Sequence, residues 1–205
     1  MKILLVDDHA LFREGLCHIL LELDTDVTLL EAHDYDHALA HVSENTDLDL
    51  ALVDLNLAGK NGFEVLTSIT CQHPTIPVVI LSESVLRSNI QKSLDLGAMG
   101  YISKDTSGAI MLNAIRLILS GEIYTPQNII KDLKETTHVE SHINHSLTRR
   151  QLEVLNLIAL GHSNKYIANE LLLTEGTVKS HITAIFKSLK VHNRTQAVIA
   201  AYKTK

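Results

Sequence analysis

The sequence predicts an α/β domain with a five-stranded, parallel, doubly wound sheet, followed by an all-α domain of four helices. Short apolar runs alternate with segments of helical periodicity over about the first 120 residues, and this alternation then stops. The charge divides at the same place: residues 1–122 carry 7 Lys and Arg against 18 Asp and Glu, hence −11, and residues 123–205 carry 11 against 6, hence +5. Only the second part is therefore expected to contact a polyanion.

Five short apolar runs are the expected strands, and a helical pattern follows each of them. The strands are expected at residues 3–6, 27–31, 50–54, 76–81 and 100–102, and the helices at residues 9–22, 35–43, 62–71, 86–96 and 106–119. Strands and helices that alternate on this scale form a parallel sheet with helices on both faces.

Polar residues stand at the carboxyl ends of four of these strands. Asp7 and Asp8 follow the first strand, Asp54 ends the third, Ser82 follows the fourth, and Lys104 lies just beyond the fifth. Each alone reads as a simple polar end to a strand. Together they favour a site, because ligands of open parallel sheets bind beyond the carboxyl ends of the strands.

The residue types at this edge suit phosphoryl chemistry. Three neighbouring carboxylates repel one another unless a divalent cation lies among them, and hard oxygen ligands suit Mg²⁺. The metal would screen an incoming phosphoryl group, so that the carboxylate of Asp54 could attack phosphorus. Lys104 and Ser82 would then bind the phosphoryl oxygens.

These residues also carry a family resemblance, which covers about the first 120 residues. Their types and separations resemble the receiver domain of two-component response regulators, in a pattern made of Asp7-Asp8, Asp54, Ser82, Tyr101 and Lys104. The resemblance implies a flavodoxin-like or CheY-like fold. It also implies that a cognate sensor histidine kinase donates phosphate to this chain.

The resemblance assigns roles to the residues of the site. Asp54 is the implied phosphoacceptor, and Mg²⁺ is held by Asp8, Asp54 and the main-chain carbonyl of Asn56, with Asp7 assisting through water. Ser82 is expected to move toward the phosphoryl group while Tyr101 turns inward behind it. Ala58 stands where the family usually has proline, which predicts a looser turn without loss of chemistry.

Domain boundaries follow from the change of pattern. Residues 1–122 are expected to form the receiver domain, residues 123–146 a linker that holds a short helix over 126–134, and residues 147–205 the second domain. Residues 135–146 are polar and without periodicity, and their three histidines lack partners at metal-ligand spacing.

Four helical patterns fill the last sixty or so residues. In the first, Leu152, Leu155 and the pair Ile158-Ala159 are expected to line one face. Ser163 and Thr174 are expected to cap the next two helices, and Asn193 to start a fourth that carries Ala197, Val198, Ala200 and Ala201. The third helix has an apolar stripe and an opposite face that carries lysines; its stripe is Val178, Ile182, Ile185 and Leu189.

The second and third helices, with their short connection, match a helix-turn-helix, whose second helix enters the major groove of DNA. The alternative is a four-helix unit that does not bind DNA, and in such a unit the lysine-bearing face of the third helix would have no function. The expected DNA contacts are Ser163, Asn164, Lys165, Thr177, Lys179, Ser180, Thr183, Lys187 and Arg194.

Motifs across residues 147–200 resemble the LuxR-type DNA-binding domain. They are Leu147-Thr148-x-Arg150, Gly161-x-Ser163-Asn164-Lys165-x-Ile167-Ala168, Thr177-Val178-Lys179-x-His181 and Arg194-Thr195-x-Ala197-Val198. Together with the receiver resemblance they make the chain similar to NarL/FixJ-family response regulators. Gln151 stands where the family usually has Glu, which leaves open whether this residue still caps the first helix.

The leading hypothesis is a response regulator whose phosphorylation at Asp54 controls sequence-specific DNA binding and transcription, and which is not a metabolic enzyme. At rest the receiver is expected to cover the recognition helix, and phosphorylation to release it and favour a homodimer. Two alternatives stay open: a regulator of the same architecture that works without phosphate, and an Mg²⁺-dependent phosphotransferase or phosphatase. No run of 18 apolar residues and no signal-peptide pattern occurs, so a cytoplasmic protein without membrane contact is expected.

Overall fold

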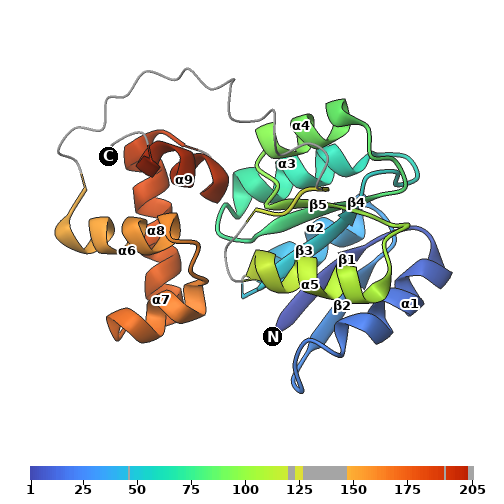
Figure 1. The fold of residues 1–205 in the computed structure, drawn as a ribbon, viewed down its shortest axis with the longest axis horizontal. Coiled ribbons are helices and arrows are strands. Elements are labelled where there is room, and N and C mark those ends of the chain that lie inside the picture. The colour runs from blue at the N-terminus through green and yellow to red at the C-terminus, as the bar shows by residue number, and fades with distance from the viewer. Residues whose placement is uncertain (46, 120–122, 127–146, 192, 203–205) are drawn as a thin grey trace.

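A computed structural model describes residues 1–45, 47–119, 123–126, 147–191 and 193–202 of this chain. Most of the expected linker, including all but the first residue of its expected short helix, lies outside the described residues. Among the residues that are described, no helix is long and apolar enough to cross a membrane. Two bodies follow one another along the chain, an α/β body and a smaller helical one (Figure 1).

The first body contains the expected five-stranded parallel sheet. Its strands run in the order β2-β1-β3-β4-β5. Their bounds are β1 Lys2–Val6, β2 Thr28–Ala32, β3 Leu50–Asp54, β4 Val78–Ser82 and β5 Gly100–Ser103. All four strand pairings are parallel. The order reverses between β1 and β3, which places a crevice at the carboxyl ends of these two strands.

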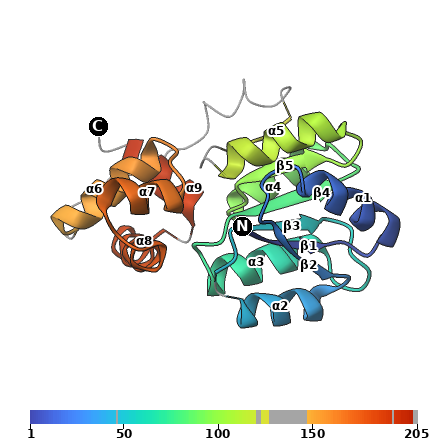
Figure 2. The same cartoon turned by 90° about the horizontal axis from the view of Figure 1, so that it is seen from below.

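Helices cover both faces of this sheet (Figure 2). They are α1 Ala10–Leu20, α2 Tyr35–Glu44, α3 Gly62–Gln72, α4 Arg87–Asp95 and α5 Gly108–Leu119. Residues of α1 and α5 share one apolar cluster with alternate strand residues, and residues of α2, α3 and α4 share the other. The central strands are therefore buried on both faces, which explains why they read as continuous apolar runs.

Element types are as predicted in this body, and the bounds move by one or two residues. The strand expected at residue 76 begins at Val78, because Pro77 before it has no N–H to donate to a neighbouring strand. The carbonyl of Pro77 still accepts from Ala51 N at 2.9 Å. The last helix of the body begins at Gly108 rather than at 106.

The second body packs four helices around one apolar cluster. They are α6 Arg149–Ala159, α7 Asn164–Leu171, α8 Glu175–Leu189 and α9 Arg194–Tyr202. The predicted caps at Ser163 and Thr174 are present, and Thr148 caps α6 in the same way: each of the three side chains accepts a bond from a backbone N–H in the first turn. The expected stripe of α8 faces the core: Val178, Ile182 and Ile185 are buried and Leu189 packs against the cluster.

One expectation for α6 is wrong. Leu152, expected on its apolar face, is 45% exposed, whereas Val154, Leu155 and Ile158 are buried. The face toward α8 and α9 is thus set by Val154 rather than by Leu152, because the helix must present its inner side to two neighbours at once.

The open question about Gln151 is settled in favour of capping. Its Oε1 accepts from Thr148 N at 2.8 Å, and Thr148 Oγ1 accepts from Gln151 N at 3.3 Å, which together make a capping box. Glutamine and glutamate have the same reach, so the neutral residue keeps this role.

Candidate functional site

Three carboxylates meet at the switch point of the sheet. Asp7 and Asp8 follow β1, and Asp54 ends the adjacent β3, in a register that pairs Val6 with Val53. Asp7 is fully buried and Asp54 is 1% exposed. Strands that run side by side in the same direction end at the same edge, which is why residues 47 positions apart lie together.

Lys104 lies among these carboxylates and is itself buried. Its Nζ is 2.7 Å from Asp7 Oδ2 and 2.8 Å from Asp54 Oδ2, and its side chain is 6% exposed. Burial raises the pKa of Asp54, against the lowering effect of Lys104 and the Asn56 N–H. Burial alone would lower the pKa of Lys104, but its bonds to Asp54 and Asp7 raise it overall.

The carboxylate oxygens are poorly satisfied by the protein. Oδ2 of Asp7, Oδ1 of Asp8 and Oδ2 of Asp54 are buried and have no hydrogen-bond partner among the described residues; Lys104 Nζ lies beside the first and the last, and His9 Nδ1 lies beside the last two. Three carboxylates against one ammonium leave a formal charge of −2 in this pocket. An all-oxygen donor set with uncompensated negative charge fits a hard divalent cation such as Mg²⁺.

His9 also belongs to this pocket, although it was expected only to begin a helix. It precedes α1 without capping it through its side chain, and its Nδ1 lies 3.1 Å from Asp8 Oδ1 and 3.3 Å from Asp7 Oδ1. The same nitrogen is 3.9 Å from Asp54 Oδ2. Its position directly after the acid pair was the signal in the sequence.

Two main-chain N–H groups of the loop after β3 orient the acids. Asn56 N donates to Asp54 Oδ1 at 3.2 Å, and Ala58 N donates to Asp8 Oδ2 at 3.1 Å. The expectation that Ala58 merely loosens the turn is therefore incomplete. A proline at this position could not make the second bond, so alanine ties the loop to Asp8.

Ser82 and Tyr101 lie on the two strands beyond Asp54. Both are fully buried, and both contact the main chain of Ser84: its N–H donates to Ser82 Oγ at 3.1 Å, and its carbonyl accepts from the Tyr101 hydroxyl. Burial raises the pKa of Tyr101. The tyrosine side chain is therefore directed inward, toward the turn after β4.

Most of the predicted DNA contacts lie on accessible parts of α7 and α8. Five are exposed, namely Lys165, Thr177, Ser180, Thr183 and Lys187. Several hydroxyls are held by their own helix: Ser180 Oγ donates to Gly176 O and Thr183 Oγ1 donates to Lys179 O, each at 3.0 Å. Ser163 is used as the cap of α7.

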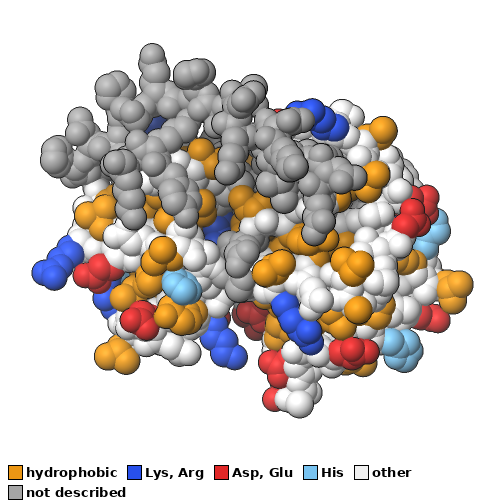
Figure 3. Space-filling view, in the orientation of Figure 1, with side chains coloured by type: hydrophobic (Ala, Val, Ile, Leu, Met, Phe, Trp, Pro, Cys, Tyr) orange, Lys and Arg blue, Asp and Glu red, His pale blue; other side chains and the backbone are white. Residues whose placement is uncertain are grey.

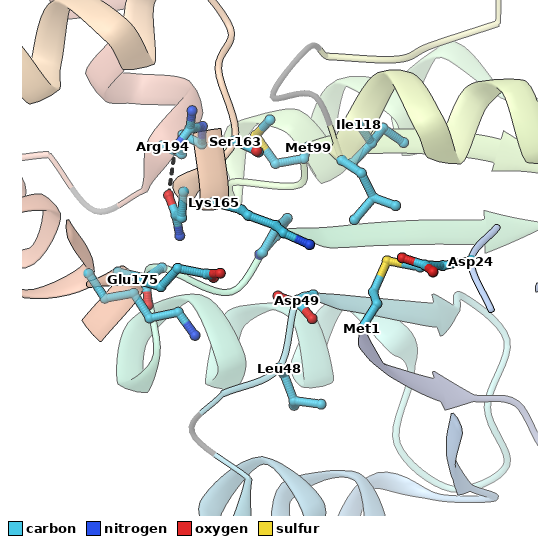
Figure 4. Close-up of a pocket in the computed structure, with 15 residues that line it drawn as sticks. Met1, Asp24, Leu48, Asp49, Met99, Ile118, Ser163, Lys165, Glu175 and Arg194 are labelled. Atoms are coloured by element: carbon cyan, nitrogen blue, oxygen red, sulfur yellow. Dashed lines mark hydrogen bonds between the residues drawn. The ribbon is translucent and has the colours of Figure 1, made fainter. Parts of the chain in front are cut away.

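Arg194 does not fit the expectation of a DNA contact. Its guanidinium donates to Asn164 Oδ1 at 3.3 Å (Figure 4) and also to His162 O, while its Nε is buried without a hydrogen bond. Burial lowers its pKa to about 10, which still leaves it protonated at neutral pH. Arg194 therefore fastens the start of α9 to the turn between α6 and α7, and Asn164 is occupied by the same bond.

The start of α8 faces the first body across a cavity of about 310 Å³ (Figure 4). Lys165, Glu175 and Lys179 line it from the helical side, and Asp24 and Asp49 from the other. In the space-filling view, basic side chains on the margin of the helical body lie across a notch from acidic side chains of the α/β body (Figure 3).

A second contact between the bodies involves the start of α9. Thr195 Oγ1 donates to Ala98 O at 3.4 Å in the buried turn before β5, and Asn193 packs so closely on Gly97 that a Cβ there would lie 2.4 Å from Asn193 Nδ2. In this arrangement the α/β body lies over the first turn of the predicted recognition helix.

Comparison with family models matches both bodies. Residues 3–116 match the model described as "Response regulator receiver domain", and residues 145–201 match the one described as "Bacterial regulatory proteins, luxR family". The first match alone covers more than half of the chain.

Two curated relatives match along nearly their whole length. The chain is 39% identical over 208 residues to the "Glycerol metabolism activator" of Pseudomonas putida, covering 98% of this chain and 94% of the relative. It is 34% identical over 203 residues to the "Nitrate/nitrite response regulator protein homolog" of Haemophilus influenzae, covering 99% and 97%.

Solved structures agree with these relatives. The response regulator ChrA of a heme-sensing two-component system shares 28% identity at a TM-score of 0.50, with 99% of this chain and 96% of that chain covered. A LuxR-family two-component response regulator from Aurantimonas shares 30% identity at a TM-score of 0.59, with 65% and 95% covered. The chain belongs to the two-component response regulators that join a receiver domain to a LuxR-type DNA-binding domain, and it controls transcription.

Proposed function

We propose that Asp54 accepts a phosphoryl group from a sensor histidine kinase and that this modification controls sequence-specific DNA binding. The observation that carries the proposal is the buried pocket in which three carboxylates face one ammonium and keep oxygens without hydrogen bonds. A buried nucleophile beside a positive charge and a cation site is what phosphoryl transfer to a carboxylate needs.

Mg²⁺ would be held by Asp8, Asp54 and the main-chain carbonyl of Asn56, with Asp7 assisting through water. When bound, it supplies the positive charge that lets an anionic phosphoryl donor approach this acidic pocket. Lys104 is already seated 2.8 Å from Asp54 Oδ2, so it can bind a phosphoryl oxygen on that carboxylate by a small shift. Ser82 would turn its hydroxyl from the Ser84 N–H toward the same group.

Phosphorylation would reach the output through the strands next to the pocket. Ser84 is bonded to both Ser82 and Tyr101, so a movement of Ser82 changes the surroundings of the tyrosine on β5. The turn before β5 also carries Ala98, which accepts from Thr195 of α9. A change at the pocket thereby has a path of direct contacts to the junction between the bodies.

The output would be DNA binding by α7 and α8. Their exposed hydroxyls and lysines suit phosphate and base contacts, but the start of α8 faces Asp49 of the receiver across the cavity. Release of this face on phosphorylation would make it accessible and would favour a homodimer through α9, on which Ala200 and Ala201 offer small side chains.

We infer the domain limits 1–122, 123–146 and 147–205; the first family match, residues 3–116, lies within the receiver limits, and the second, residues 145–201, begins two residues before 147. The architecture supports a transcription factor rather than a metabolic enzyme, since the second domain is spent on a helix-turn-helix. Because the binding partner is DNA, we infer that the protein acts in the cytoplasm, where the DNA lies.

The test is DNA binding by the purified full chain on enriched genomic fragments, before and after acetyl phosphate with Mg²⁺. Wild type is compared with Asp54→Asn and with Asp36→Asn, a matched control at an exposed aspartate of α2. We expect tighter binding after treatment for wild type and Asp36→Asn only. Equal binding by all samples would favour a regulator that works without phosphate, and absence of binding in all would contradict the DNA-binding role.

A further inference from the structure

A cluster of two histidines and one aspartate lies in the turn between β2 and α2. It is outside the pocket of Asp7, Asp8, Asp54 and Lys104, which we call the phosphoryl pocket. His33 directly follows β2, Asp34 is the N-cap of α2, and His37 is in the first turn of that helix. Because Asp34 and His37 are three positions apart at a helix start, they lie on one side of it.

The three side chains already converge. His37 Nδ1 is 2.8 Å from Asp34 Oδ1, and His33 Nε2 is 3.4 Å from Asp34 Oδ2. The two imidazole rings lie with their centroids 4.1 Å apart, and one ligand atom from each residue can be chosen so that all three lie within 4.8 Å of one another. Donor atoms bound to one zinc ion in tetrahedral geometry are about 3.3 Å apart, so small side-chain rotations would suffice.

The two oxygens of Asp34 have different tasks. Oδ1 accepts from His37 N at 2.9 Å and holds the helix cap, whereas Oδ2 lies beside His33 Nε2. One carboxylate can thus cap the helix and offer its second oxygen to a cation.

We propose that His33, Asp34 and His37 form a binding site for a zinc-class divalent cation. Imidazole nitrogens select the later first-row metals over Mg²⁺, which prefers oxygen ligands only. The histidine side chains are 59% and 56% exposed, so the cation can enter from solvent and water can complete its coordination. The chain would then hold two cation sites of different ligand chemistry on one edge of its sheet.

The site is coupled to the phosphoryl pocket through one backbone bond. Asp7 N donates to Ala32 O at 3.0 Å, and Ala32 immediately precedes His33. A cation that tightens the turn after β2 would therefore act on the same strand end that positions Asp7.

The test is zinc titration of the full-length protein by calorimetry in excess Mg²⁺, so that the pocket of Asp7, Asp8 and Asp54 is already occupied. The probe is Zn²⁺ alone, and the variants are His33→Gln and His37→Gln. His41→Gln is the matched control: it lies one turn further along α2, and its Nε2 contacts Glu31 O at 3.1 Å, outside the cluster. Asp34 is left intact, since its loss would also uncap α2.

We expect one zinc to bind wild type and His41→Gln equally, and each of the other two variants to bind it at least roughly tenfold more weakly. In imidazole NMR spectra, zinc should shift the resonances of His33 and His37 and leave that of His41 in place. Equal zinc affinity in all four proteins would overturn the proposal, as would zinc-induced shifts confined to other histidines such as His9.

Discussion

The phosphoryl pocket and the recognition helix of this regulator differ in solvent exposure: the functional groups of the pocket are buried, and those of the helix are exposed. In the pocket, Asp54 and Lys104 are buried, and their charges are held within 2.8 Å of each other with little solvent to moderate them. On α8, Thr177, Thr183 and Lys187 are exposed, and the hydroxyl of Thr183 is bonded only to its own helix.

This difference shows how such a protein can be regulated. Chemistry in a buried pocket depends on where each atom is held, so the pocket is assembled by strand ends and main-chain bonds. DNA contact by an exposed helix depends on access, so it can be controlled by whatever lies in front of it. The cavity lined by Asp49 and Lys179 lies between the domain that holds the buried pocket and the helix whose access is to be controlled.

The largest expected effect tests how rigid the pocket is. In Gly62→Ala, the new Cβ would lie 2.1 Å from the carbonyl oxygen of Asp54 and 2.8 Å from Leu55 Cα. Because these are main-chain atoms, we expect the free energy of unfolding to fall by about 3 kcal/mol, measured in urea. Gly15→Ala is the control: no atom lies within 4 Å, and the exposed helix position should gain about 0.5–1 kcal/mol. A similar small gain in the free energy of unfolding for Gly62→Ala would show that the main chain around Asp54 can move to make room for the new Cβ.

The second prediction asks whether Arg194 belongs with the buried or the exposed residues. Arg194→Gln leaves His162 O and Asn164 Oδ1 without their donor, so we expect the free energy of unfolding to fall by about 2 kcal/mol, with no change in the salt dependence of DNA binding. Lys187→Gln should have the opposite pattern. We expect its free energy of unfolding to stay within about 0.5 kcal/mol of wild type, and the slope of log DNA affinity against log salt concentration to fall in magnitude by about 1. A reduced slope for Arg194→Gln would restore it as a phosphate contact.

The third prediction concerns the charge held in the pocket. Burial raises the pKa of Asp54 above its unfolded value, so protonation favours the folded state. The associated stability is present at low pH and is lost as pH rises through the folded pKa. At neutral pH without Mg²⁺, Asp54→Asn should therefore raise the free energy of unfolding by about 1 kcal/mol.

The gap between Asp54→Asn and wild type should narrow as pH is lowered toward the folded pKa, and also when Mg²⁺ is added. Urea titrations at several pH values check this, with Asp36→Asn as the exposed control. A less stable Asp54→Asn would mean that its ion pair with Lys104 outweighs the cost of burial.

The smallest expected effect lies at the junction of the two regions. Thr195→Val keeps the shape of the side chain but removes its bond to Ala98 O at 3.4 Å. A lost neutral bond is worth about 0.5–1 kcal/mol, so the unphosphorylated protein should bind DNA about two- to fivefold more tightly. Thr67→Val, which removes a hydroxyl bond to Phe63 O within α3, should leave DNA affinity unchanged. Weaker DNA binding by Thr195→Val would contradict a role of this contact in covering α8.

Element types and the polar strand ends that form the pocket were predictable from local patterns, whereas the place of His9 in it was not. Each central strand is buried on both faces, so it had to be a continuous apolar run, and its first polar residue marks the sheet edge. The helix caps at Thr148, Ser163 and Thr174 were predictable for the same reason, since a cap acts within three residues of itself.

Other features depend on neighbours distant in the sequence. Leu152 is exposed because α8 and α9 together choose the inner face of α6, and a single helix pattern does not contain that choice. Arg194 looked like one more basic residue of a DNA-binding domain. Only the fold brings it to His162 O, about thirty residues earlier in the chain, where its hydrogen bond joins the start of α9 to the turn between α6 and α7.

By itself, the sequence determined the two domains, the order of their elements and the polar residues at the carboxyl ends of the strands, because these follow from short-range periodicity and residue type. Tertiary structure alone decided the inward position of Tyr101, the bond from Ala58 to Asp8 and the placement of the receiver over the start of α8. These depend on packing between segments far apart in the chain, where small differences in distance decide which contact forms.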